Sequence, residues 1–135
     1  MVVSVSGYSD LKRLHETRAF FTDNRTDEKV EFGKSLRGSP EEVPERYTQG
    51  SPLTYVSADD PPVLSFHEQG DLVTPVEQVG LLDAKLKEFG VPHAVLPYTP
   101  LAGREWVVSQ DGTIGDEEPE DALFDFFDEH LKGGM

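Results

Sequence analysis

One stretch of the sequence, residues 61–90, constrains the fold more than any other because a strand, a loop and a helix follow one another there with clear boundaries. Two prolines open the stretch, and a short apolar run at 63–66 comes next. Such a run is typical of a strand that is buried on both faces of a sheet. His67 ends the run, and the chain then turns polar. The pattern predicts a strand near residues 63–67.

The helix that follows this strand has signals at both of its ends. Thr74 suits the N-cap, Pro75 suits the first helical position, and Glu77 stands three residues after the threonine, as in a capping box. Apolar residues then recur at spacings of three and four, which places them on one helical face. Gly90 is the expected C-terminal stop. We expect a helix near residues 75–89.

Two further apolar runs complete the expected sheet. One comes directly after the helix, at residues 93–98, and a β-branched run occupies residues 2–6. A strand, a helix and a second strand in this order form a βαβ unit, whose strands are parallel and whose crossover is right-handed. The sequence therefore predicts an α/β domain with a small, mainly parallel sheet of about three strands.

The pattern is weaker outside this unit. Residues 11–21 permit a helix, and residues 39–47 predict a short one because Ser-Pro-Glu-Glu opens the segment. Residues 22–34 are polar and indicate a solvated loop, and residues 99–119 also look like a loop. An apolar face predicts a last helix near residues 121–132.

The strand, loop and helix carry a likeness to a known family. The residues involved are His67, Glu68, Asp71, Thr74-Pro75 and Phe89-Gly90-Val91-Pro92. This pattern resembles the acid-bearing region of α/β-hydrolase esterases, lipases and related peptidases, with Glu68 in place of the usual glycine. Residues 2–11 and 39–64 also look like preceding segments of that family. The likeness covers nearly the whole chain but only the latter half of the family's fold, and it implies a truncated, three-layer α/β-hydrolase-like domain over residues 1–135.

The resemblance assigns roles to two residues. Asp71 takes the place of the carboxylate that orients the catalytic histidine. That histidine follows the last strand in the family, and Arg104 stands at the corresponding position here. A guanidinium keeps its proton at any ordinary pH and cannot accept one from a serine. We therefore predict that Arg104 is not a general base, and that it lies within salt-bridge reach of Asp71.

The nucleophile of the family is also missing from the sequence. Its serine sits in a Gly-x-Ser-x-Gly turn, beside backbone N–H groups that bind an oxyanion. The chain contains no such motif. Ser6 and Ser9 are the nearest candidates, but they lack the paired glycines and follow a strand that resembles the one after the family's serine turn. The family's order of serine, acid and histidine then leads us to expect that the N-terminal half of the fold is absent.

The histidines offer little catalytic or metal-binding potential. His67 is close to Asp71 in the sequence, but a histidine at the end of a strand is more often structural. None of the four histidines shares close spacing with another, so no metal site is expected. The acidic cluster after Asp111 lacks the alternating oxygen ligands of a calcium loop. No cofactor is expected.

Composition excludes several partners. Twelve basic residues against 26 acidic ones give a formal net charge of -14, which opposes binding to nucleic acid or to an anionic membrane surface. The absence of cysteine excludes disulfides, thiolate metal sites and a thiol nucleophile. No stretch approaches the roughly 20 apolar residues of a membrane span. The N-terminus lacks a basic segment followed by a long apolar run, so the expected compartment is the cytoplasm.

Three functions from different classes remain open. The first, which we favour, is a catalytically silent α/β-hydrolase segment related to esterases and lipases, because two of the three triad members are missing. The second is a carboxylic-ester hydrolase that a partner chain completes, or that uses an unusual site formed by Ser6, Ser9 and His67.

The third is a module that binds a small ligand or a protein in a relic cleft. The residues of this cleft are Asp71, Arg104, His67, Glu68 and Trp106. An aromatic ring beside a cation suits a small carboxylate.

The first strand leads to an expectation about assembly. In the family, the strand at residues 2–6 pairs with the strand that bears the nucleophile, so its outer N–H and C=O groups are expected to be unpaired here. Apolar surface that the absent half would cover is expected to be exposed as well. A homodimer through the N-terminal strand, or through the exposed core face, would cover both.

Overall fold

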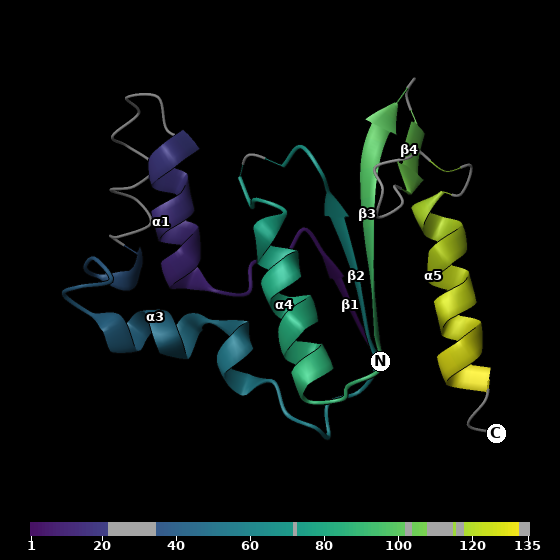
Figure 1. The fold of residues 1–135 in the computed structure, drawn as a ribbon, viewed down its shortest axis with the longest axis horizontal. Coiled ribbons are helices and arrows are strands. Elements are labelled where there is room, and N and C mark those ends of the chain that lie inside the picture. Colours follow the sequence, from purple (N-terminus) through teal and green to yellow (C-terminus); the bar gives the residue numbers. More distant parts are fainter. Residues whose placement is uncertain (22–34, 72, 102–103, 108–114, 116–117, 133–135) are drawn as a thin grey trace.

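The computed structural model describes residues 1–21, 35–71, 73–101, 104–107, 115 and 118–132. These residues form a sheet with helices on both of its faces (Figure 1). Within the described part of the chain, no helix is long and apolar enough to cross a membrane. The solvated loop that was expected at residues 22–34 lies outside the described residues.

The sheet has the strand order β1-β2-β3-β4. Its first three strands are parallel: β1 (Val2–Val5), β2 (Val63–Glu68) and β3 (His93–Leu101). Helix α4 (Glu77–Glu88) connects β2 to β3. The predicted parallel sheet and its βαβ unit are therefore confirmed.

The expectation of a loop throughout residues 99–119 was wrong. Strand β3 continues to Leu101, and β4 (Arg104–Val107) pairs antiparallel with it, so that Thr99 faces Trp106. Tryptophan and valine favour strands, and the end of β3 supplies the backbone groups with which β4 pairs. A glycine next to this short strand in the sequence and the polar residues after it concealed the hairpin.

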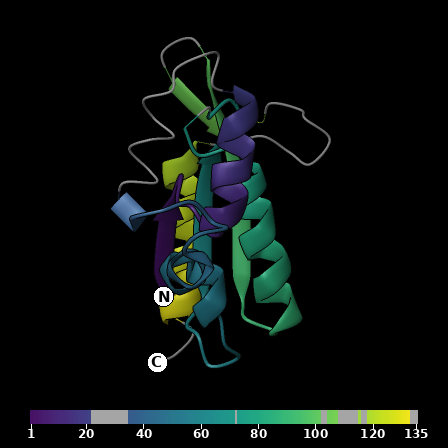
Figure 2. The same cartoon turned by 90° about the vertical axis from the view of Figure 1, so that its left-hand side faces the viewer.

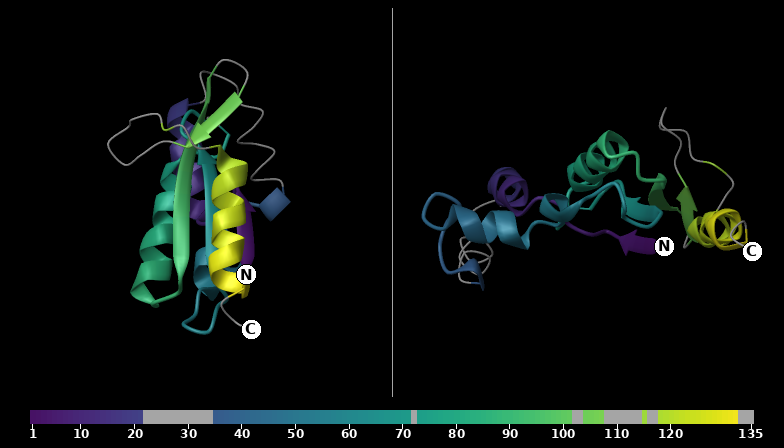
Figure 3. Two further views of the ribbon diagram at one scale, coloured as in Figure 1. Left: turned by 90° about the vertical axis from the view of Figure 1, so that its right-hand side faces the viewer. Right: turned by 90° about the horizontal axis from the view of Figure 1, so that it is seen from below.

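Residues of the strands alternate between the two faces of the sheet, and each face has a core of its own. The core on the face that α5 (Pro119–Phe127) covers consists of Leu64, Phe66, Ala122 and Phe126. The core on the face that α4 covers consists of Val63, Leu86 and Val91. Figure 3 shows α4 and α5 on opposite sides of the strands. Strand β2 is buried from Val63 to His67, which agrees with the prediction of a strand covered on both faces.

Helix α4 ends where the sequence indicated. Gly90 has a φ of 70°, in the left-handed region. Its N–H donates to the carbonyl of Lys87 at 3.2 Å, and the N–H of Val91 donates to the carbonyl of Leu86 at 3.0 Å. These two bonds form a Schellman motif, which satisfies carbonyl groups in the last helical turn.

The beginning of α4 differs from the prediction. The helix begins at Glu77, and its N-cap residue, Val76, makes no side-chain capping bond. The capping box between Thr74 and Glu77 does not form, because the Glu77 carboxylate bonds instead to Arg13 in α1 (Leu11–Phe21). A tertiary contact has replaced the local one.

The last helix is confirmed. Helix α5 continues into a π-helical turn, η2 (Asp128–Lys132). Pro119 occupies the first helical position, and Glu120 and Asp121 lie in the first turn, where negative charge suits the helix dipole.

Two N-terminal helices lie beside the sheet, as Figure 2 shows from that side. Helix α1 fits the expected range and packs against α3 (Pro44–Gly50). Their shared core consists of Leu11, Leu14 and Tyr47. A 3-10 turn, η1 (Pro52–Tyr55), follows α3 and leads back towards the sheet.

Helix α3 begins five residues later than the sequence indicated. The capping bonds at Ser39 do form: its N–H donates to Glu42 Oε2 at 2.9 Å, and the Glu42 N–H donates to Ser39 Oγ at 3.4 Å. However, a residue before proline avoids the helical conformation. Val43, which precedes Pro44, has a φ of -135° and a ψ of 54°. The first turn therefore stops there, and the helix starts again at Pro44.

Candidate functional site

The predicted site residues gather at the end of the sheet where β2 and β3 have their carboxyl ends. Glu68 is the last residue of β2 and pairs with Tyr98, and Asp71 lies in the loop that follows. Strand β4 pairs with the end of β3 (Figure 1). Its first residue, Arg104, pairs with Leu101, which brings the backbone of Arg104 to the same end of the sheet. The side chains of Arg104 and Trp106 lie outside the described part of the structure. The salt bridge to Asp71 and the relic cleft therefore stay predictions.

Asp71 organises its own loop. Its Oδ1 accepts hydrogen bonds from the N–H groups of Val73 and Thr74, both at 2.8 Å. An aspartate that bonds the backbone two and three residues further on closes a turn. The N–H of Asp71 also donates to the carbonyl of Glu68 at 3.2 Å. Asp71 thus fixes the path of the chain from β2 towards α4.

His67 ties the end of β2 to the same loop. It is 1% exposed, and its Nε2 lies 2.6 Å from the carbonyl oxygen of Thr74. Because a carbonyl oxygen can only accept, Nε2 carries the proton and donates it. A general base needs a lone pair directed at the proton that it removes. In this arrangement Nε2 has no such lone pair. The lone pair of the neutral ring is on Nδ1, and the burial of the ring closes it to a substrate.

Ser9 and Gln78 form a buried polar joint between the segments that lead into α1 and α4. Ser9 is 1% exposed and Gln78 is fully buried. Gln78 Oε1 accepts hydrogen bonds from the N–H groups of Ser9 and Asp10, each at 2.9 Å, and the Ser9 hydroxyl donates to the backbone carbonyl of Gln78. Among the described residues, no acceptor lies within reach of Gln78 Nε2. A hydroxyl held in this way is closed to a substrate.

Sequence reasoning missed Gln78. A single glutamine on an amphipathic helix is not part of any recognisable motif. Its amide bonds to residues about 70 positions away in the sequence. The only available signal was a polar residue next to apolar Val79 on the inner face of the predicted helix.

Ser6 ends β1 in a left-handed backbone conformation, with a φ of 48°. Its N–H donates to the carbonyl of Phe66 at 2.8 Å. Non-glycine residues with positive φ are uncommon and occur at turns and at functional sites. Here the conformation stops the ladder between β1 and β2 and turns the chain towards α1.

An ion pair that the sequence did not indicate joins α1 to α4. The guanidinium of Arg13 places Nη2 at 2.8 Å and Nε at 2.9 Å from Glu77 Oε1, and the Thr17 hydroxyl lies 3.2 Å from Oε2. The hydrogen bond from Arg13, above all, lowers the pKa of Glu77, and the same bond raises the pKa of Arg13. The side chains are 48% and 40% exposed, so solvent screens the pair and its effect on stability is small.

The other histidines have structural surroundings. His15 makes an edge contact with the ring of Tyr47. The rings of His130 and Phe126 lie 4.3 Å apart between centroids and are tilted by 54°. His93 Nε2 lies 3.0 Å from Asp83 Oδ1. In the described part of the chain, no group of three or more His, Asp or Glu side chains is arranged to hold a metal ion.

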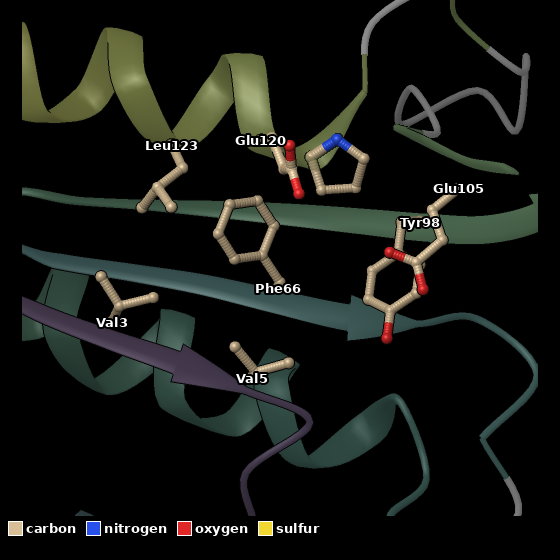
Figure 4. Close-up of a pocket in the computed structure, with 8 residues that line it drawn as sticks. Val3, Val5, Phe66, Tyr98, Glu105, Glu120 and Leu123 are labelled. Carbon is tan, nitrogen blue, oxygen red and sulfur yellow. The ribbon is translucent and has the colours of Figure 1, made fainter.

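A cavity of about 240 Å³ lies between β1 and α5 (Figure 4). Its lining includes the apolar side chains of Val3, Val5, Phe66 and Leu123, and the carboxylates of Glu105 and Glu120. Two carboxylates repel an anionic ligand. Asp71 is not among the lining residues, so this cavity differs from the relic cleft that the sequence suggested.

Comparison with known proteins finds matches to one kind of fold. The family model of BD-FAE, an esterase-like α/β-hydrolase domain, matches residues 1–86. No curated protein matches the sequence. Similar solved structures include a truncated form of a carbohydrate esterase from gut microbiota, and an acylaminoacyl peptidase in complex with Z-Gly-Gly-Phe-chloromethyl ketone.

Both structures are longer than this chain. The match to the esterase has a TM-score of 0.54 at 20% identity and covers 72% of this chain and 33% of the esterase. The match to the peptidase has a TM-score of 0.60 at 22% identity and covers 96% of this chain and 20% of the peptidase. At these identities the likeness establishes the fold. The chain spans about one third of the first structure and one fifth of the second.

Proposed function

The chain belongs to the BD-FAE family of esterase-like α/β-hydrolase domains, and on this premise we propose that it is a hydrolase-related segment that does not hydrolyse esters by itself. One observation carries the proposal: a candidate nucleophile and the candidate base are both 1% exposed, and both donate to backbone carbonyls. The Ser9 hydroxyl donates to Gln78, and His67 Nε2 donates to Thr74. A serine hydrolase needs a base nitrogen that accepts the proton of an exposed serine.

The sequence supports the same proposal. It contains no Gly-x-Ser-x-Gly motif, and the resemblance places Arg104 where the family has its catalytic histidine. A guanidinium cannot exchange a proton with a serine near neutral pH. Asp71 keeps the family's position after β2, but its Oδ1 holds the loop backbone. The chain therefore retains the scaffold around the acid without a nucleophile and base that act on it.

The test is an ester-hydrolysis assay on the purified chain. A p-nitrophenyl ester of a short fatty acid should release no more p-nitrophenol than with the heat-denatured protein. A fluorophosphonate probe, which labels activated serines, should add no mass to the intact chain. Ser6→Ala removes a candidate serine hydroxyl at the end of β1, and Ser57→Ala is its control, because Ser57 bonds Asp60 elsewhere in the fold.

Turnover that persists through repeated purification, disappears in Ser6→Ala and survives in Ser57→Ala would contradict the proposal. It would favour the alternative of an unusual serine site. Turnover that disappears in Asp71→Ala would show that the acid is still in use.

Self-association is the second part of the proposal. Strand β1 lies at one edge of the described sheet, and its valines are exposed: Val2 by 46%, Val3 by 39% and Val5 by 64%. Exposed apolar side chains on an open edge favour contact with another strand. A homodimer is the expected assembly.

A further inference from the structure

Strand β1 has unpaired backbone groups at fixed positions. The N–H of Val2 donates to the carbonyl of Pro62, and the N–H of Ser6 donates to the carbonyl of Phe66, both at 2.8 Å. Backbone groups alternate in direction along a strand, so the even-numbered residues face β2. Val3 and Val5 therefore direct their N–H and C=O groups away from the described sheet. A second strand can bond to these groups.

The side chains of β1 are uncharged on both sides of the sheet, and three of the four are valines. Val3 and Val5 point to the face of α5, where they line the cavity beside Leu123 (Figure 4). Val2 and Ser4 point to the opposite face and line a second cavity, of about 310 Å³. Natural edge strands usually carry a charge or a proline that prevents pairing. Strand β1 has neither, so its occupant should be an uncharged strand with apolar side chains on both faces.

A second copy of β1 has this chemistry. The first nine residues contain no charged side chain, although the whole chain has a formal net charge of -14. An interface formed by two β1 strands therefore contains no acidic residue of β1 from either copy. The opposite edge of the described sheet is β4, which carries Arg104 and Glu105. Among the described strands, β1 is the edge strand that is free of charge.

Symmetry restricts how two copies of β1 can pair. Residues that lie opposite each other in an antiparallel ladder point to the same face, so a two-fold axis must pass through a residue and not between two residues. An axis at Ser4 places Val3 opposite the second copy's Val5. Every outward-facing N–H and C=O group of β1 then has a hydrogen-bond partner in the second copy. An axis at Val3 would place Val5 opposite Met1, which lies outside the strand.

We propose that two copies of the chain join through β1 in an antiparallel pair centred on Ser4, which makes one continuous sheet across the two-fold axis. This pairing rests on the assembly part of the proposed function and is independent of the catalytic part. Val3 and Val5 of both copies then form two hydrogen-bonded pairs whose side chains lie together beneath the two α5 helices. Salt should strengthen the dimer, because it screens the repulsion between two acidic chains.

Light scattering coupled to size exclusion tests the pairing with a proline. The wild-type chain should have the mass of a dimer at high micromolar concentration and moderate salt. Val5→Pro should have the mass of a monomer, because proline removes an outward N–H and leaves the bonds between β1 and β2 in place. Circular dichroism should show an unchanged fold. A wild-type monomer under these conditions would overturn the proposal.

A charged substitution offers a matched control. Val5 is 64% exposed and Val73, in the loop after β2, is 65% exposed. Val5→Lys should raise the dissociation constant by at least about tenfold, a loss of about 1.4 kcal/mol. Val73→Lys should leave the constant unchanged. Equal effects of the two lysines would show that net charge governs association, and the edge-to-edge pairing would be wrong.

Single cysteines test the register, because the natural chain has no cysteine. Non-hydrogen-bonded antiparallel pairs have Cα atoms about 4.5 Å apart, which falls within the range for a disulfide. Under mild oxidation, Ser4→Cys should form a dimer that reductant separates, and the fold of the purified protein should persist. Val3→Cys and Val5→Cys should cross-link much more slowly. In each of these variants the cysteine of one copy lies opposite a valine of the other copy, and not opposite a second cysteine. Faster cross-linking through Val3→Cys would exclude the axis at Ser4.

Discussion

Two glycines in the crossover between β2 and β3 should respond oppositely to the same substitution. Gly90→Ala should destabilise the fold, whereas Gly80→Ala should stabilise it. Gly90 has a φ of 70° at the stop of α4, and Gly80 lies inside the helix. A Cβ atom at either position would meet no atom within 4 Å. Crowding therefore plays no part, and the backbone conformation alone distinguishes the two sites.

The expected magnitudes follow from that difference. Alanine in the left-handed region costs about 1–2 kcal/mol. The reduced freedom of the unfolded chain offsets about 0.4–1 kcal/mol of this, which leaves a net loss of about 1 kcal/mol at Gly90. Inside a helix, alanine is more stable than glycine by about 1 kcal/mol. At an unfolding entropy of about 2.1 cal/mol/K per residue over 135 residues, the melting temperatures should differ by roughly 7 °C.

Urea denaturation followed by far-ultraviolet circular dichroism measures both variants against the wild type. Equal slopes with denaturant would show that all three proteins expose the same surface on unfolding. If Gly90→Ala is at least as stable as the wild type, the left-handed stop of α4 is not required. If Gly80→Ala also loses stability, side-chain surroundings outweigh backbone conformation, and the reasoning from φ fails.

Two further substitutions test the contacts between α1 and α4. Glu77→Gln should lower the free energy of unfolding by about 0–1 kcal/mol near neutral pH, because it removes the carboxylate charge that attracts the Arg13 guanidinium. Arg13 holds the pKa of Glu77 below its ordinary value, so this contribution exists above the unfolded-state pKa and is lost as the pH falls through the folded-state pKa. In acid, the free energies of unfolding of the variant and the wild type, measured with urea, should become equal. A difference that persists in acid would contradict the ion pair. Gln78→Ala should cost about 1–3 kcal/mol in the same assay, because it leaves the N–H groups of Ser9 and Asp10 without their acceptor. An unchanged urea midpoint would show that these groups find other partners.

The elements that the sequence predicted well are those with local signals at both ends. Strand β2 lies between a pair of prolines and a polar loop, and α4 ends at a glycine that adopts positive φ. The predictions that failed involved competing influences. Pro44 interrupts a helix that correct capping residues at Ser39 begin, and β4 depends on its pairing with the end of β3. A four-residue strand has too few residues for an apolar pattern to stand out.

The site was harder to predict because its contacts join distant parts of the sequence. The likeness to α/β-hydrolases placed Asp71 at the correct end of the sheet, after β2. It did not indicate that the Glu77 carboxylate would bond to Arg13 instead of capping its own helix. It also did not indicate that Gln78 would accept hydrogen bonds from the residues before α1. Such pairs depend on how helices pack, which no local spacing records.

The separate core between α1 and α3 has a consequence for how the molecule opens. Its buried residues are Leu11, Leu14 and Tyr47. Its contacts with α4 include the hydrogen bonds to the amide of Gln78 and the exposed ion pair of Glu77, and it lies beside the sheet instead of within its layers (Figure 2). Regions with small cores open at lower free energy than the elements that they adjoin. Amide protons of α1 should therefore exchange with deuterium through a partial opening that leaves the amides of β2 protected, so the chain behaves as two cooperative units of unequal stability.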